Sequence, residues 1–237
     1  MNLAKATAAL ESIDPEDLVP YREYFKAITP VTNEEKFRRG LFAFASVHTG
    51  WAANVNLYAL LWDLDWLEDQ ERLRELIEES RAGLTNGRTK SIWQFSEHFK
   101  LDPEWYEKKD NELWTQYRDR IQLRTLGLGH AKSSFLCELL YPNESEAVCG
   151  DTHMLQDYGL KGNSAPSQKT YGYIEAHWVS ECKRLGLAPV AARWYLWDRK
   201  QGHSDSRYWS YCLEGNKPGL VLPRQLELFT WKETMIA

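Results

Sequence analysis

The sequence predicts an all-α protein, and three observations lead to that fold class. Apolar residues recur at the spacing of a helix face through most of the chain. Residues that start helices, such as Asp followed by Pro or Thr followed by Glu, stand before several of these runs. No stretch alternates apolar and polar residues as a half-buried strand does, and there is no internal repeat. We therefore expect two helical lobes with a central cleft between them.

The first half of the chain reads as helices joined by short connections. A helix is predicted after Asp14-Pro15 and ends at Pro30, and a second helix follows the capping segment Thr32-Asn-Glu-Glu. The next two helices are predicted over 51–64 and, amphipathic, over 68–80, and Asn86-Gly87 marks a turn. One more helix starts at Ile92, and the last is capped by Asp102-Pro-Glu and continues through Ile121.

The second half continues the pattern with longer connections. A helix begins after Asp151, and the segment 159–169 is a loop rich in Gly, Ser and Asn. A long helix over 171–185 ends at Gly186, and Pro189 opens a helix over 190–197. The segments 198–207 and 218–223 read as loops, followed by a last short helix or extended arm.

A glycine turn interrupts the helices at Leu126-Gly-Leu-Gly-His-Ala. Because Gly127 and Gly129 carry no side chain, the backbone can turn tightly there and approach another surface closely. The amphipathic run that follows predicts a helix whose first amides, near His130 to Lys132, lack internal partners and form an anion site. A nucleic-acid phosphate fits such a site, although any tight connection between two helices also needs glycines.

Asp151 lies nineteen residues after Lys132 and precedes Thr152, His153 and an apolar helical run. An aspartate followed by threonine before such a run is typical of a helix N-cap. Taken alone, the pattern favours a capping role without any catalytic one.

These segments resemble the helix-hairpin-helix-GPD superfamily of DNA glycosylases, which includes endonuclease III and 8-oxoguanine glycosylase. The sequence Leu126-Gly-Leu-Gly is similar to the family's Leu-Pro-Gly-Val-Gly hairpin, and Gly150-Asp-Thr-His is similar to its Val-Asp-Thr-His segment. Upstream, Val47-His-Thr-Gly-Trp-Ala-Ala-Asn-Val-Asn resembles the Gln-Asn-Thr-x-Trp-x-Asn-Val segment of the endonuclease III-like branch. The resemblance implies one domain over 1–237, with 41–159 the best-matched core and 160–237 a helical part that completes the lobes.

The resemblance implies a DNA glycosylase, which flips a damaged or modified base out of duplex DNA and cleaves its N-glycosidic bond. It assigns a catalytic carboxylate to Asp151, which would stabilise the developing oxocarbenium ion and orient the nucleophile. The hairpin residues implied to bind DNA are Leu126, Gly127, Leu128, Gly129, His130 and Ala131.

Lys132 is the candidate for a second catalytic group. Glycosylases that also cut the strand form a Schiff base between a neutral lysine and the sugar. In those family members the lysine stands two positions after the second hairpin glycine, where this chain has Ala131. One residue rotates a helical side chain by about 100°, so Lys132 faces either the pocket or a phosphate. Excision with and without lyase activity are both open.

A flipped base needs a pocket that sandwiches its faces and reads its edge. The candidates share an aromatic, amide or imidazole side chain: His48, Trp51, Asn54, Trp194, Trp197 and His203. His203 and Asp205 form a possible acid–base pair in a segment that matches no family pattern. Core packing and loop capping are the plainer explanations for these residues. Gln156 also stands where the family often has arginine.

These departures keep two other functions open. Phages that hypermodify thymine encode proteins with a similar scaffold, which transfer an amine or amino acid onto an activated hydroxymethyl group of a pyrimidine in DNA. In such an enzyme Asp151 would act on the incoming amine and no base would leave. The third candidate is a non-catalytic DNA-binding module, but a hairpin alone needs far less chain.

Composition limits the partners and the setting. The net charge is −5, yet residues 1–117 hold 14 basic and 21 acidic side chains whereas 118–237 hold 15 and 13, so the second half can present a basic face to double-stranded DNA. The cysteines Cys137, Cys149, Cys182 and Cys212 lack metal-ligand spacing, and we expect no metal and no cofactor.

No apolar run has transmembrane length and no signal peptide is evident. We expect a cytoplasmic, monomeric protein, with a phage gene expressed in a bacterial host as one setting.

Overall fold

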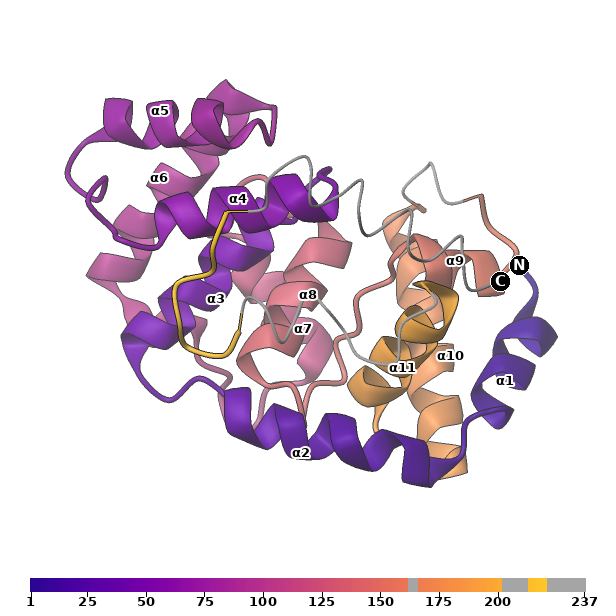
Figure 1. Ribbon diagram of the computed structural model, residues 1–237. Coiled ribbons are helices and arrows are strands. Elements are labelled where there is room, and N and C mark those ends of the chain that lie inside the picture. The colour runs from indigo at the N-terminus through magenta and orange to yellow at the C-terminus, as the bar shows by residue number, and fades with distance from the viewer. Residues whose placement is uncertain (162–165, 202–212, 221–237) are drawn as a thin grey trace.

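The computed structural model describes residues 1–161, 166–201 and 213–220, and the regular structure in these ranges is entirely helical. The helices form two lobes (Figure 1). The helices of the first lobe are α3 (Asn33–Ala45), α4 (Trp51–Leu61), α5 (Gln70–Ser80), α6 (Thr85–Leu101), α7 (Trp114–Gln122) and α8 (His130–Leu140). The second lobe consists of α1 (Leu3–Glu11), α9 (Thr152–Asp157), α10 (Gln168–Leu185) and α11 (Pro189–Gln201). The all-α prediction is confirmed.

Helix α2 (Val19–Ile28) lies along both lobes (Figure 1). It follows a short 3-10 turn, Pro15–Leu18, whose start Asp14 caps by accepting the amide of Glu16 at 3.0 Å. Phe25 of α2 packs edge-on against Trp194 of α11, with ring centroids 4.4 Å apart. The early part of the chain thus supports the helix that carries Trp194.

Aromatic side chains form much of the first lobe's core. Phe37 of α3 stacks on Phe95 of α6 with centroids 5.3 Å apart, and Phe99 and Tyr106 continue the cluster. Gly40 belongs to this contact, since a Cβ there would lie 2.2 Å from the Phe95 ring. Many of the chain's aromatic residues are therefore accounted for by core packing.

Several predicted helix boundaries are confirmed. Thr32 and Glu35 form a capping box at the start of α3, where each side chain accepts the other residue's amide. Gly186 ends α10 in a left-handed conformation, with φ 70°. Asp151 caps α9 as the pattern predicts.

Other predictions were wrong. Asn86 and Gly87 do not form a turn but lie in the first turn of α6, because Gly83 and Leu84 take the positive φ values that reverse the chain. The helix expected to run from Asp102 through Ile121 is two elements, a 3-10 turn at Pro103–Tyr106 and α7. Asp102 forms an ion pair with Arg124 at 2.9 Å instead of capping a helix.

The boundaries of two other helices also differ, and one helix has no counterpart in the prediction. The helix predicted over 51–64 ends at Leu61, and α11 continues to Gln201 through part of the segment expected to be a loop. Helix α1, which the sequence reading had not identified, packs on α10 and α9.

Residues 213–220 lie against the first lobe. The buried Arg39 of α3 donates hydrogen bonds from Nη2 to the carbonyls of Ile28 at 2.6 Å and Leu213 at 3.1 Å. Lys217 forms an ion pair with Asp63. Residues 213–220 thus lie on the lobe opposite the one that contains α11.

Candidate active site

The hairpin between α7 and α8 depends on its two glycines in different ways. Gly127 has a φ of +93°, and a Cβ there would lie 2.5 Å from Ser91 Oγ. This position therefore needs glycine for the fold itself. Gly129 has a φ of −76°, and a Cβ there would meet nothing within 4 Å. Leu128 is buried between them and anchors the turn, whereas Leu126 is exposed.

The start of α8 directly follows this hairpin. Gly129 is the N-cap residue and makes no side-chain cap, and the first amides of the helix, at His130 and Ala131, have no intrahelical partner. Burial lowers the pKa of His130, as does the nearby Arg118, while Asp119 opposes them. A neutral imidazole and free amides at a positive helix end suit an anionic group such as a phosphate.

A hollow of about 470 Å³ lies beside the hairpin. His48 and Leu84, both exposed and both at positive φ, line it together with Gly127. Arg88 holds its wall because the guanidinium donates to the carbonyls of Phe44 and Gly83. The hairpin surface therefore continues into a concave face bordered by two exposed turn residues.

The segment before Asp151 is clamped through three consecutive amides. Val148 donates to Glu175 Oε1 at 3.0 Å, Cys149 donates to Glu138 Oε1 at 2.6 Å, and Gly150 donates to the Tyr171 hydroxyl at 2.9 Å. A Cβ at Gly150 would lie 2.8 Å from the Tyr171 ring, so this close packing requires glycine. The backbone that presents Asp151 is thereby fixed by α8 and α10.

Both carboxylate oxygens of Asp151 have partners. Oδ1 accepts the Met154 amide at 2.9 Å, which is the N-cap bond of α9. Oδ2 accepts from Arg193 Nη1 at 3.0 Å. The side chain is 22% exposed. Asp151 is thus a helix cap and also one half of an ion pair with α11, which fixes the orientation of its carboxylate.

Asp151 opens onto a cavity of about 270 Å³ between the lobes. Its walls come from the end of α3, the loop before α4, α8, the segment that carries Asp151, and α11. The lining residues are Ser46, Thr49, Lys132, Phe135, Cys149, Asp151, Thr152, His153, Arg193, Trp194 and Trp197. This composition places charged groups beside aromatic rings, as a pocket for a planar polar ligand requires.

Lys132 lies in the first turn of α8 and lines this cavity with Asp151. Burial is the main cause that lowers the pKa of its amine, and Arg193 adds to the effect, whereas Cys149, Asp151 and Glu138 oppose it. Its Nζ lies 5.0 Å from the centroid of the Phe135 ring. Of the two orientations left open by the sequence, the structure shows the one toward the cavity.

The predicted base-pocket residues separate into three groups. Trp194 and Trp197 line the cavity. Asn54 is buried in α4 and Trp51 lies at the start of that helix, and neither they nor His48 line it. Ser46 and Thr49 occupy the corresponding wall instead. His203, with Asp205, lies outside the described residues.

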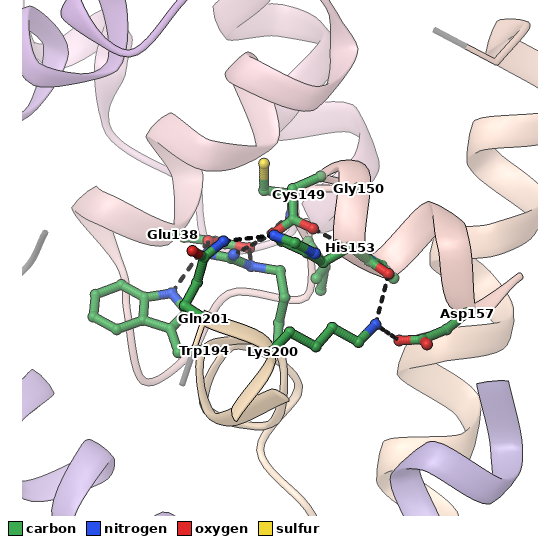
Figure 2. Close-up of polar contacts among 12 residues, drawn as sticks. Glu138, Cys149, Gly150, His153, Asp157, Trp194, Lys200 and Gln201 are labelled. Atoms are coloured by element: carbon green, nitrogen blue, oxygen red, sulfur yellow. Dashed lines mark hydrogen bonds and ion pairs between the residues drawn. The ribbon is translucent and has the colours of Figure 1, made fainter. Parts of the chain in front are cut away.

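Sequence reasoning missed Glu138 and the pairing of Arg193 with Asp151. Glu138 is fully buried in α8 and accepts from Arg193 Nε at 2.9 Å. It also accepts from the Trp194 indole at 3.4 Å (Figure 2). An ionisable residue inside the apolar run of 135–140 was the available signal, because such a group is rarely buried without a partner. His153 also meets α11, where its ring nitrogen lies 2.6 Å from Gln201 Nε2 (Figure 2).

The described ranges contain neither a cluster of metal-binding side chains nor a helix that could span a membrane. No group of three or more His, Cys, Asp or Glu side chains could hold a metal ion among those residues. None of the described helices is long and apolar enough to cross a membrane.

The comparisons with known proteins show the fold. No family model and no curated protein sequence matches this chain. Among solved structures, the 8-oxoguanine DNA glycosylase of Methanocaldococcus jannaschii superposes with a TM-score of 0.66 at 17% identity, covering 84% of this chain and 94% of that one. The 8-oxoguanine DNA glycosylase of Thermotoga maritima superposes with a TM-score of 0.65 at 18% identity, covering 86% and 100%. The chain therefore shares its fold with these two 8-oxoguanine DNA glycosylases, as the resemblance of its segments implies.

Proposed function

We propose that this protein is a DNA glycosylase that flips a damaged or modified base out of double-stranded DNA and cleaves its N-glycosidic bond. The observation that carries the proposal is the meeting of Lys132 and Asp151 in one cavity, directly behind a glycine hairpin. The fold shared with two 8-oxoguanine DNA glycosylases supports it.

The hairpin face would hold the DNA backbone. The amides at His130 and Ala131 suit a phosphate, and Gly129 leaves room for the strand to approach. Phosphate contacts of this kind position the duplex without reading its sequence. The neighbouring hollow with Leu84 and His48 extends the same face, and an exposed leucine can separate bases as the duplex bends.

The cavity would receive the flipped nucleotide. The aromatic side chains Phe135, Trp194 and Trp197 supply apolar surface for the base, and Ser46 and Thr49 supply hydrogen-bonding groups for its edge. Asp151, held by its cap bond and by Arg193, would stabilise positive charge that develops on the sugar.

Lys132 would act as the nucleophile. Its neutral amine attacks C1′ of the deoxyribose, the C1′–N bond breaks, and the base leaves with the bonding electrons and acquires a proton. Opening of the sugar ring then gives an imine between Nζ and C1′. The lowered pKa of Lys132 supports this role because only the unprotonated amine can attack.

A base-hypermodification transferase is the second candidate. It is favoured by one observation, namely that Ala131 occupies the position of the lysine in bifunctional family members. A flipped pyrimidine with an activated hydroxymethyl group would occupy the same cavity. The incoming amine would displace the activating group, which leaves with the hydroxymethyl oxygen, and would give up a proton to Asp151, while the glycosidic bond would stay intact.

One experiment separates these functions. The protein is incubated with duplexes that each carry one lesion or modified base, with and without an amine donor, and the DNA products are analysed by mass. A glycosylase releases a free base and leaves an abasic or cleaved strand. A transferase gives a strand of increased mass only when the donor is present. Binding without any product in the whole panel would contradict both enzymatic functions.

A further inference from the structure

Arg193 is a buried cation placed between two carboxylates from different elements. It lies on α11 with only 5% of its surface exposed. Its Nε and Nη2 donate to the two oxygens of Glu138 on α8, the former at 2.9 Å, and its Nη1 donates to Asp151 Oδ2 at 3.0 Å. A single guanidinium thus joins α8, α11 and the N-cap of α9.

Glu138 explains why the guanidinium is held so firmly. Its oxygens also accept the amide of Cys149 and the indole N–H of Trp194, so this one carboxylate binds three separate groups (Figure 2). A buried carboxylate without a cation is strongly unfavourable, and so is a buried guanidinium without an anion. Glu138 and Arg193 therefore require each other, and Asp151 is the additional partner.

Lys132 faces this charge network without joining it. In residues 1–161, 166–201 and 213–220 the amine forms no ion pair, although several ionisable groups face it from the surrounding elements. These are Glu138 on its own helix, Cys149 and Asp151 on the segment before α9, and Arg193 on α11. Glu138 and Asp151 both attract a proton to Lys132, and Arg193 is bonded to both.

We propose that Arg193 is a positioning residue that occupies the Glu138 and Asp151 carboxylates, so that neither captures the Lys132 amine and Asp151 keeps its orientation toward the cavity. The catalytic consequence rests on the proposed function, because an amine free of its proton matters only if it attacks a substrate. The electrostatic arrangement itself belongs to the free protein. Without Arg193, the two carboxylates would lose the cation that they share, and Lys132 is a cation on which both of them act.

The test is a pH titration of Lys132 in the full-length protein without DNA. Lysine labelled with ¹³C at Cε is incorporated, and the Lys132 signal is identified by its disappearance in Lys132→Arg. In Arg193→Gln the titration midpoint of Lys132 should rise by about one unit or more, since two unpaired carboxylates now face the amine. In Glu138→Gln it should stay unchanged or fall, because an anion has been removed.

The Lys132 midpoint should rise in Arg193→Gln and should not rise in Glu138→Gln, and this difference distinguishes a positioning role from a merely structural one. Loss of packing would open the site in both variants and move both midpoints toward that of an exposed lysine. Arg120→Gln is the control, because Arg120 forms a bidentate pair with Glu112 that is largely shielded from solvent, and it lines no part of the cavity. In Arg120→Gln the titration midpoint of Lys132 should equal that of the unsubstituted protein.

Arg193→Lys provides a second variant if Arg193→Gln does not fold. It keeps the cation but can bond fewer oxygens, so the midpoint of Lys132 should move upward less than in the Gln variant. An unchanged midpoint in Arg193→Gln, or a rise in Glu138→Gln, would overturn the proposal. Failure of the proposed function looks different, because the lesion panel would give no product with the unsubstituted protein while the titrations still moved as described.

Discussion

Lys132 and Asp151 line the same cavity, although one lies in the first turn of α8 and the other caps α9. They meet because the segment after α8 is bound back to that helix, where the Cys149 amide bonds to Glu138. A potential nucleophile and a fixed carboxylate are thus placed at one opening between the lobes. Substitutions at Lys132 and Asp151 should therefore affect the chemistry, whereas substitutions in the hairpin should affect DNA binding.

Gly129 tests the hairpin more cleanly than Gly127. Because a Cβ at Gly129 meets no atom of the protein within 4 Å, Gly129→Val should cost only about 1 kcal/mol of stability, which is the loss of glycine at the N-cap position of α8. Affinity for duplex DNA should fall by a similar factor for every sequence, since the lost contacts go to the backbone. Binding is measured by fluorescence anisotropy at several salt concentrations, and affinity of the unsubstituted protein should decrease steeply with salt.

Gly127→Val is the informative contrast. Its positive φ and its contact with Ser91 predict a loss of stability as well as of binding. If Gly129→Val binds DNA as tightly as the unsubstituted protein, the hairpin is not the DNA-binding surface.

Asp151→Asn should separate capping from catalysis. Asparagine caps a helix about as well as aspartate, but Arg193 loses one of its two carboxylate partners. We expect a loss of stability of about 1–3 kcal/mol, with turnover reduced by roughly 10²-fold or more. The measurements are chemical denaturation and single-turnover kinetics on the substrate found with the lesion panel.

Asp157→Asn is the matched control for that variant. Asp157 is a buried carboxylate on the same short helix, and it pairs with Lys200 (Figure 2). It does not line the cavity that holds Asp151 and Lys132. It should lose stability to a similar degree and keep its turnover. Near-native turnover in Asp151→Asn would leave Asp151 as a helix cap alone.

The local features of this site could be predicted from sequence because they depend on neighbouring residues. A glycine turn before an amphipathic run and an Asp-Thr pair before an apolar run each give a definite structure within a few residues. Gly127 and Asp151 lie where those patterns put them. The orientation of Lys132 could not be predicted, because it depends on how α8 packs against α3 and α7.

The long-range pairs could not be predicted from local patterns. Glu138 and Arg193 lie 55 positions apart and meet only when α11 packs against the first lobe. Long-range contacts also decide the structure after Asp102. The ion pair of Asp102 with Arg124 and the contact of Tyr106 with Phe99 favour a 3-10 turn over a continued helix. Tertiary contacts of this kind override local preference.

Lys132→Met should stabilise the protein at neutral pH. Burial lowers the pKa of Lys132 in the folded state, so the unfolded chain binds more protons between that lowered pKa and the ordinary value of 10.5. Stability of the unsubstituted protein therefore rises with pH across that window. The gain in stability from Lys132→Met should be largest at pH values below that window and should shrink as the pH rises toward 10.5. Melting temperatures measured at several pH values check this, and an advantage that grows with pH would contradict it.

Lys132→Gln distinguishes the enzymatic mechanisms. If the amine attacks the sugar, borohydride reduces the resulting imine and leaves a covalent protein–DNA adduct that is visible on a denaturing gel. Lys132→Gln should abolish this adduct completely, while base release that depends on Asp151 alone could continue. Lys183→Gln is the control, because Lys183 pairs with Glu146 on the surface of α10, and it should form the adduct as the unsubstituted protein does.

The products without an adduct are equally informative. Free base without trapping, unaffected by Lys132→Gln, would indicate a glycosylase in which Asp151 activates water. No adduct and no free base, together with a gain in DNA mass that requires an amine donor, would indicate the transferase. We expect the trapped adduct, because Lys132 faces the cavity beside Asp151, and its surroundings lower the pKa of the amine.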